Sequence, residues 1–174
     1  GSGTVSGLDL LTDSEKIKQN IGYMSQKFSL YTELTVAENI RFYGGIYGLG
    51  GSQMTDRLNW ALELAGLQGY ADARVGQLSL GFRQRLALAC SLLHEPGVVF
   101  LDEPTSGVDP LTRRRFWATI REMARHRITV FVTTHYMEEA EYCDRIAFIN
   151  RGRLMACDSP AAIKKTAVKN RIFQ

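Results

Sequence analysis

Apolar and polar positions along the chain predict strands and helices in alternation. Residues 98–101 form a short apolar run that follows a His-Glu-Pro-Gly turn and ends at Asp102 and Glu103. A run of this length is typical of a buried central strand in a parallel sheet. A second strand, rich in β-branched residues, is predicted over residues 128–134, and another ends at Gln26. Because helices and strands alternate in the second half of the chain, we expect parallel pairing through right-handed crossovers.

Residues 27–77 have a helical pattern instead. Residues 34–43 repeat apolar positions with a helical period, and Thr35 is in the position of an N-cap. We expect the Gly-Gly pair that follows, and the glycine-rich run after it, to interrupt this helix. A second helix is predicted over residues 55–67, from apolar residues at Leu58, Ala61, Leu62 and Ala65.

Local signals predict the remaining elements. A strand at residues 4–10 precedes a polar helix at residues 13–19. Pro110 is expected to open a helix, where its missing N–H costs nothing. That helix should bury Phe116, Ile120 and Met123 and turn Arg113, Arg114 and Arg121 outward. Residues 145–156 are predicted to form a hairpin around residues 150–152.

Composition narrows the class of protein. At 174 residues and 45% hydrophobic content, one globular domain with a sizeable core is expected. The net charge of +3 is too small to indicate a nucleic-acid surface, and the basic residues at 164–165 and 169–171 are predicted to be a solvated helix end. Cys90, Cys143 and Cys157 form no CxxC pair and are predicted to be reduced core residues of a cytosolic protein. No apolar run approaches the roughly 20 residues that cross a bilayer, so a membrane role requires a partner.

The two carboxylates after the central strand are the first candidate site. Open α/β sheets bind their ligands at the carboxyl ends of the strands. Asp102 can hold Mg²⁺ there, and Glu103 can activate a water molecule for attack on a phosphate. The alternative is a strand that ends in a solvated acidic turn, and this short motif alone does not decide between the two.

Further motifs surround this strand in a fixed order. Gln77–Arg85 runs into a helical pattern, Pro104–Pro110 follows the carboxylates, and His135 follows the strand at residues 128–134. Together with Ile21–Gln26, these segments resemble the nucleotide-binding domain of an ATP-binding-cassette (ABC) transporter. The matches are Gln26 to the Q-loop, residues 78–82 to the signature loop, 98–103 to Walker B, 106–109 to the D-loop and His135 to the switch histidine. The resemblance covers nearly the whole chain. The sequences of the Q-loop and signature segments are similar to those of bacterial type-2 exporters of drugs or polymers. In particular, they are similar to the second cassette of tandem-cassette proteins.

The chain contains no P-loop. That motif, Gly-x-x-x-x-Gly-Lys-Ser/Thr, cradles phosphates with its backbone N–H groups and lysine, and neither Gly-Lys-Ser nor Gly-Lys-Thr occurs in the sequence. In the family the P-loop precedes the Q-loop by several tens of residues, whereas only 25 residues precede Gln26 here. The first three, Gly1 to Gly3, look like part of a tag. We therefore expect a fragment that lacks the front third of the domain and is inactive by itself.

The resemblance implies an α/β fold. It would be a P-loop-NTPase-like, mostly parallel sheet with an inserted helical subdomain, without the Walker A strand and the antiparallel β subdomain. Residues 4–26 and 78–174 would form the partial RecA-like ATPase core, and residues 27–77 the helical signature subdomain. The implied cofactors are ATP and Mg²⁺, and the implied partners are transmembrane permease subunits and a second nucleotide-binding domain in a head-to-tail dimer. No nucleic acid is implied, and the implied location is peripheral, on the cytoplasmic side of the bacterial inner membrane.

The resemblance also implies roles for single residues. Asp102 would hold Mg²⁺ through water, Gln26 would contact the ion or the water, and Glu103 would be the general base. His135 would contact the γ-phosphate, the alternative being a histidine that caps the helix after it.

The signature loop departs from the family pattern. Ser79 and Gly81, at a helix start where free N–H groups favour anions, would bind the γ-phosphate held by the opposing subunit. Leu80 and Phe82 stand where the usual Leu-Ser-Gly-Gly-Gln has glycine and glutamine. The alternative for Ser79 is an ordinary N-cap. Asp109 matches the D-loop aspartate that couples the two sites of a dimer, and it can serve as an N-cap at the same time.

Two other groups of residues complete the predictions. Aromatic residues follow the Q-loop at Phe28, Tyr31, Phe42, Tyr43 and Tyr47. Most should be core, with one or two lining the groove for a helix of the transmembrane subunit. His94 and His126 are predicted to be surface residues.

The leading interpretation is the ATPase subunit of an ABC exporter. One alternative is a soluble ABC ATPase that acts on ribosomes or DNA. A DNA-repair relative would carry a long coiled-coil insert, for which residues 27–77 are too short, and a ribosomal relative would show a charged linker. The other alternative is a non-catalytic interaction module, which fits this fragment better than a longer parent.

Overall fold

The computed structural model describes residues 1–171, with the side chains of residues 1–166. The chain divides into two compact units, Gly1–Thr133 and Thr134–Gln174, and not into the single domain predicted from its length. Within the described residues, no helix combines the length and the apolar character needed to span a membrane.

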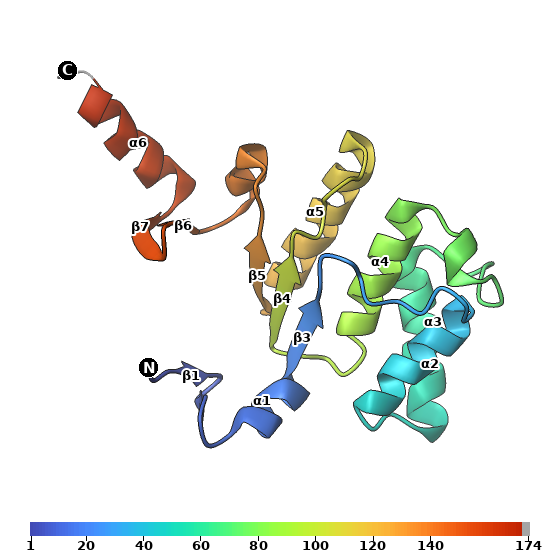
Figure 1. Ribbon diagram of the computed structural model, residues 1–174. Coiled ribbons are helices and arrows are strands. Elements are labelled where there is room, and N and C mark those ends of the chain that lie inside the picture. The colour runs from blue at the N-terminus through green and yellow to red at the C-terminus, as the bar shows by residue number, and fades with distance from the viewer. Residues whose placement is uncertain (172–174) are drawn as a thin grey trace. The chain divides into compact units, whose positions relative to one another are not determined.

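The first unit contains most of the elements (Figure 1). In chain order they are β1 (Thr4–Val5), β2 (Leu8–Asp9), α1 (Ser14–Asn20), β3 (Ile21–Met24), α2 (Val36–Ile46), α3 (Gly51–Ala65), the 3₁₀ turn η1 (Val75–Gln77), α4 (Leu80–Ser91), β4 (Val98–Asp102), α5 (Pro110–Arg125) and β5 (Thr129–Thr133). The predicted strand at residues 4–10 is instead a short hairpin, because Ser6 and Gly7 turn the chain at φ of 51° and 79°.

Strands β3, β4 and β5 form a parallel sheet in that order, with β4 in the centre as predicted. The register places Tyr23 opposite Phe100 and Phe100 opposite Phe131. Because all three strands are parallel, their carboxyl ends meet at one edge, where the candidate site residues follow the strands.

One face of this sheet is covered by helices. Gly22 lies so close to α4 that a Cβ there would come within 2.4 Å of the Ser91 carbonyl oxygen. Val99 and Leu101 of β4 are buried on the same face. Helix α5 also packs on the sheet, through β5, and buries Phe116, Ile120 and Met123 as predicted, together with Trp117. Two right-handed crossovers in one direction place α4 and α5 on the same face.

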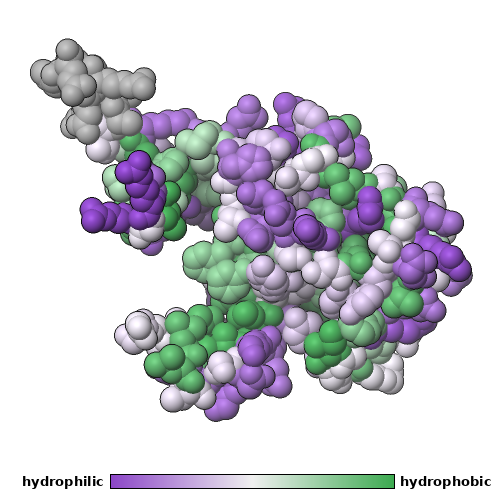
Figure 2. Space-filling view, viewed as in Figure 1, coloured by the Kyte–Doolittle hydropathy of each residue, from purple (hydrophilic) through white to green (hydrophobic). Residues whose placement is uncertain are grey.

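The other face of the sheet is open within the first unit. Tyr23 and Phe131 are 58% and 56% exposed, and Phe100 between them is half-buried. The Phe100 and Phe131 rings stack with centroids 5.2 Å apart and an interplanar angle of 13°. Figure 2 shows apolar surface in the region of the sheet. This row of three aromatic residues is named the aromatic row below.

Helices α2, α3 and α4 enclose a separate apolar cluster, named the helical core below. Its buried members are Val36, Ile40, Ala61, Leu62, Ala65, Leu67, Val75, Leu78, Leu86, Ala89, Cys90 and Leu93. Thr35 begins α2 with a complete capping box, since its hydroxyl accepts from the Glu38 N–H and the Glu38 carboxylate accepts from the Thr35 N–H. The N-cap prediction is therefore confirmed.

The expectation that the Gly-Gly pair ends this first helix is wrong, because α2 continues through Gly44 and Gly45 to Ile46. The reason is a tertiary contact with another helix. Gly44 is buried against Met54 of α3, whose Cε would lie 2.7 Å from an added Cβ. The missing side chain at Gly44 thus allows the two helices to approach closely.

The second unit contains η2 (Met137–Tyr142), β6 (Ile146–Asn150), β7 (Arg153–Asp158) and α6 (Pro160–Arg171). β6 and β7 form the predicted antiparallel hairpin. Arg151 and Gly152 at its turn have φ of 48° and 72°, as two-residue hairpin turns require. Lys164 of the basic segment forms an ion pair with Glu141. The basic residues at 169–171, which were predicted to be part of a solvated helix end, lie outside the range in which side chains are described.

The cysteine prediction holds only in part. Cys90 is fully buried in the helical core, and burial raises the pKa of its thiol. Cys143 is half-buried, whereas Cys157 is exposed and lies 3.4 Å from an Arg145 guanidinium nitrogen. Cys157 is therefore a surface residue, because β7 belongs to a two-stranded hairpin in which nearly every position of that strand is exposed.

Candidate functional site

The carboxyl ends of β3 and β4 bring three of the predicted site residues together. Gln26 follows β3 by two residues, Asp102 is the last residue of β4, and Glu103 comes next. The Gln26 Nε2 donates to the Glu103 Oε2 at 2.7 Å, across 77 residues of sequence. The parallel pairing of β3 and β4 is what places an amide and two carboxylates at one edge of the sheet.

Glu103 has a backbone conformation that side-chain-bearing residues rarely adopt, with φ of 44°. Its N–H donates to two oxygens of Thr133, the carbonyl at 3.1 Å and the hydroxyl at 3.0 Å. The Thr133 hydroxyl also lies 2.5 Å from the Asp102 Oδ1. Thr133 was missed in the sequence analysis. The available signal was a hydroxyl residue at the carboxyl end of a strand predicted to lie beside β4.

This set of donors fits a magnesium ion bound together with phosphates. Carboxylate and amide oxygens are hard ligands that suit Mg²⁺, which usually takes one or two carboxylates and completes its shell with water and phosphate oxygens. Among the described residues, no group of three or more His, Cys, Asp or Glu side chains is arranged to hold a metal ion. Asp102 and Gln26, at and just after the carboxyl ends of neighbouring strands, suit a cation that is also bound by a nucleotide.

The signature loop forms the start of α4. The Ser79 hydroxyl caps this helix by accepting from the Phe82 N–H at 3.4 Å. Gly81 packs against α5, where an added Cβ would lie 2.9 Å from the Thr112 Cγ2. Leu80 packs beside Gly107: a Cβ added to Gly107 would lie 3.5 Å from the Leu80 Cδ2. Leu80 thus has a packing partner in the segment after Walker B, and Gly81 leaves no room for a side chain.

Asp109 is the N-cap of α5, as predicted. Its Oδ1 accepts from the N–H groups of Leu111 and Thr112, both at 3.0 Å. Hydrogen bonds from the Thr112 side chain and backbone, and then from Leu111, lower the pKa of the Asp109 carboxyl. The buried Gln84 of α4 donates to the Pro104 carbonyl oxygen, a contact that the sequence analysis did not foresee. The signature helix, the loop after Walker B and the D-loop are therefore joined by direct contacts.

His135 belongs to the second unit and is described with it. It is exposed, two residues beyond the end of β5, and its ring centroid lies 4.2 Å from that of Tyr136. The assignment of His135 as the switch histidine stays a prediction.

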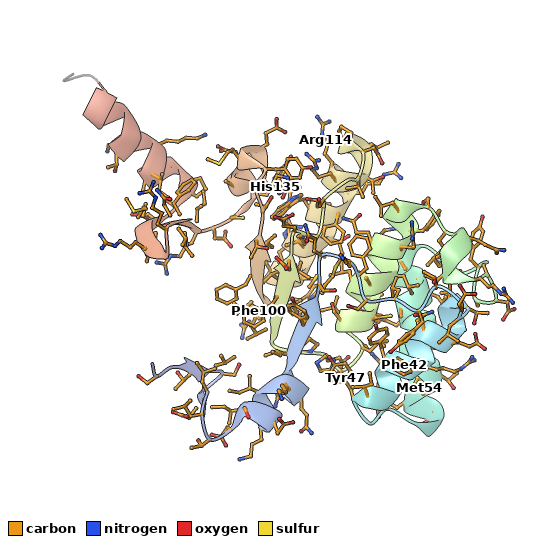
Figure 3. The ribbon with its side chains drawn as sticks, viewed as in Figure 1. Phe42, Tyr47, Met54, Phe100, Arg114 and His135 are labelled. Atoms are coloured by element: carbon orange, nitrogen blue, oxygen red, sulfur yellow. The ribbon has the colours of Figure 1, made fainter. Side chains whose placement is uncertain are left out.

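The aromatic residues after Gln26 divide into two groups. Tyr31 and Phe42 are 48% and 41% exposed and meet edge to face, with ring centroids 4.7 Å apart. Phe28, Tyr43 and Tyr47 are half-buried. The Tyr43 hydroxyl donates to the Ser29 carbonyl oxygen, and burial raises the pKa of Tyr43 to about 12. Figure 3 shows Phe42 and Tyr47 at one end of the helical segment, near Met54.

His94 is not the surface residue that was predicted. It is half-buried, its Nε2 lies 3.0 Å from the Ile21 carbonyl oxygen, and its ring stacks on Tyr47 at a centroid distance of 3.5 Å. It therefore links the end of α2 to the start of β3. His126 is exposed, as predicted.

Comparison with known proteins shows the family to which the chain belongs. The ABC transporter family profile matches residues 1–106. The probable multidrug ABC transporter ATP-binding protein YbhF of Escherichia coli K12 is 54% identical over 164 residues, covering 94% of this chain and 28% of that protein. The linearmycin resistance ATP-binding protein LnrL of Bacillus subtilis is 37% identical over 157 residues, covering 90% of this chain and 50% of that protein. The chain thus spans half or less of the length of these relatives.

A solved structure gives the same assignment. The structure of cbiO1 from Clostridium perfringens, described as part of the ABC transporter complex cbiONQ, matches with a TM-score of 0.83 and 25% identity. The match covers 97% of this chain and 70% of that one. The predicted fold class, a mixed α/β structure of the ABC ATPase type, is confirmed by this likeness. The chain belongs to the ABC transporter family of ATP-binding proteins.

Proposed function

We propose that the chain is part of the ATP-binding and ATP-hydrolysing subunit that powers an ABC-type exporter. The observation that carries the proposal is the hydrogen bond between Gln26 and Glu103 at the carboxyl edge of the sheet, where Asp102 is the residue before Glu103. An amide held on a carboxylate next to a second carboxylate is the arrangement that positions a water molecule for attack on a phosphate. The family membership supports ATP as the nucleotide.

Each residue at this edge has a proposed task. Glu103 takes a proton from the attacking water, and Gln26 holds the Glu103 side chain in place through its amide. Asp102, together with the amide oxygen of Gln26, would hold Mg²⁺. When bound, this ion neutralises charge on the phosphates. His135 would contact the γ-phosphate.

The signature residues serve a second copy of the domain. Ser79 and Gly81 stand at the N-terminus of α4, where free N–H groups and the helix dipole favour an anion. In the proposed head-to-tail dimer they bind the γ-phosphate held by the opposing subunit. Asp109, fixed as the cap of α5, couples the two sites. Residues 4–26 and 78–174 belong to the ATPase core in this proposal, and residues 27–77 to the helical subdomain.

The proposed partner on the membrane side is a permease subunit. Tyr31 and Phe42 form an exposed aromatic pair close after Gln26, and an exposed apolar pair of this kind suits a helix of the permease. The protein would sit peripherally on the cytoplasmic side of the bacterial inner membrane. The relatives' names, which concern multidrug transport and linearmycin resistance, support drugs or similar compounds as the exported class.

The proposal is tested by Glu103→Gln in a form of the protein that includes a P-loop. ATP binding should be retained, whereas turnover should fall by about 10² to 10⁴, because an amide cannot accept the proton of the water. The matched control is Glu95→Gln, since Glu95 is exposed, pairs with Arg57 and precedes β4, at the opposite end of that strand from Glu103. Near-normal turnover of Glu103→Gln would show that Glu103 is not the base.

The same assay has a second arm on residues 1–174 alone. Because this sequence has no Gly-Lys-Ser/Thr, the phosphates lack their cradle, and we expect neither tight MgATP binding nor hydrolysis. A calorimetric titration that gives micromolar binding to this chain would overturn that expectation.

A further inference from the structure

We infer that Thr133 is a positioning residue for both carboxylates of the site. This inference rests on the proposed function of Asp102 and Glu103. Thr133 ends β5, and the strand register places it directly opposite Asp102. Its hydroxyl lies 2.5 Å from the Asp102 Oδ1 and 3.0 Å from the Glu103 N. One side-chain oxygen therefore contacts the last residue of the neighbouring strand and the residue that follows it.

The chemistry fixes the direction of both hydrogen bonds. An ionised carboxylate can only accept, and a backbone N–H can only donate. The Thr133 hydroxyl hydrogen must therefore point at Asp102, while its lone pair receives the Glu103 N–H. Both bonds lie at one edge of the sheet, and the hydroxyl has no freedom to rotate without losing one of them.

This contact also supports an unfavourable backbone conformation. Glu103 has φ of 44°, and a residue with a side chain pays a cost to stay in that region unless its surroundings hold it there. The Glu103 N–H is shared between the carbonyl and the hydroxyl of Thr133. The turn at Glu103 sends its side chain to Gln26, while the side chain of Asp102 stays with Thr133. Thr133 thereby holds two adjacent carboxylates in different places, so that each can have its own proposed role.

The test compares three variants in a form of the protein that includes a P-loop. Thr133→Val keeps the shape of the side chain and removes the hydroxyl, whereas Thr133→Ser keeps the hydroxyl. Thr129→Val is the matched control, because Thr129 is an exposed threonine at the other end of the same strand, opposite Val98.

Two readouts are measured. The first is amide hydrogen exchange at Glu103 without nucleotide, which we expect to be about fivefold faster in Thr133→Val, since the N–H loses one of its two acceptors. The second is steady-state turnover, where kcat should fall about tenfold with little change in KM, because misplaced carboxylates impair the reaction more than substrate binding. Thr133→Ser should restore both values, and Thr129→Val should leave both unchanged.

The inference is overturned if Thr133→Val has wild-type exchange at Glu103, or if Thr133→Ser is as impaired as Thr133→Val. If the valine variant does not fold, Thr133→Ala replaces it with the same expected values. The exchange readout does not depend on catalysis. Failure of the proposed function, seen as normal turnover in Glu103→Gln, is therefore distinguishable from failure of this inference.

Discussion

The helical core and the three-stranded sheet cover their apolar surfaces to very different extents. In the helical core, Ile40 and Leu93 are fully buried by neighbouring helices. In the sheet, α4 and α5 cover one face, while Tyr23 and Phe131 of the aromatic row remain more than half exposed within the first unit. The proposed site residues lie at or after the carboxyl ends of strands of this half-covered sheet, or at the starts of the helices packed on it. The proposed chemistry thus lies beside the less completely covered of the two apolar regions.

The difference has an energetic consequence. Full burial of an aliphatic or aromatic side chain contributes roughly 1.5–3 kcal/mol, and a half-exposed side chain contributes correspondingly less. The sheet also ends at β5, which pairs with β4 alone in the first unit, and unpaired strand edges are templates for further strands. We therefore expect another segment or another molecule to cover the aromatic row and the β5 edge.

The largest effect is expected from paired truncations in the two regions. Ile40→Ala should lower the free energy of unfolding by about 2–5 kcal/mol, because it leaves a cavity in a fully packed cluster. Phe131→Ala removes a larger side chain but should cost less than about 1 kcal/mol, since Phe131 is already 56% exposed. Urea denaturation followed by circular dichroism measures both. Equal losses for the two variants would contradict the difference between the regions.

A smaller effect is expected at His94, which connects the two regions. Burial, and then the nearby charge of Arg57, lower its pKa, although the Ile21 carbonyl favours the protonated form. In the described part of the chain its Nδ1 is buried without a hydrogen-bond partner, so a proton there would be unsatisfied. Because the pKa of His94 is lowered in the folded state, His94 is protonated in the unfolded chain first as the pH falls. The stability from neutral His94 is therefore complete above the ordinary histidine pKa of about 6.5 and is lost as the pH falls below it.

The measurement is the melting temperature from about pH 7.5 to about pH 5.5, a range that brackets the ordinary histidine value. His94→Phe retains a ring to stack on Tyr47 but cannot ionise, so its melting temperature should fall less on acidification than that of the wild type. His126→Phe is the control, because His126 is exposed, and it should behave like the wild type. A His94→Phe curve parallel to the wild type would remove His94 from the pH dependence.

Local signals in the sequence predicted the elements whose causes are local. Thr35 caps α2, Asp109 caps α5, and Arg151 with Gly152 makes the hairpin turn, each within a few residues of chain. The apolar run before Asp102 was enough to predict a central strand, because burial on a parallel sheet leaves that pattern.

The features that could not be predicted depend on contacts between distant segments. Helix α2 continues through Gly44 because Met54 of another helix packs there. His94 is half-buried because its partners are Ile21 and Tyr47. The role of Thr133 depends on the register of β5 against β4, and the sequence pattern does not set that register.

Light scattering on the 174-residue chain tests most directly whether the sheet, unlike the helical core, is left uncovered. We expect the weight-average mass to rise above that of a monomer as the concentration increases, because the aromatic row and the β5 edge offer apolar surface and free backbone groups. Phe131→Lys should shift this association to higher concentration, whereas Ala124→Lys, at an exposed position of α5, should not. A stable monomer at high micromolar concentration, with a single cooperative melt, would contradict the difference between the two regions.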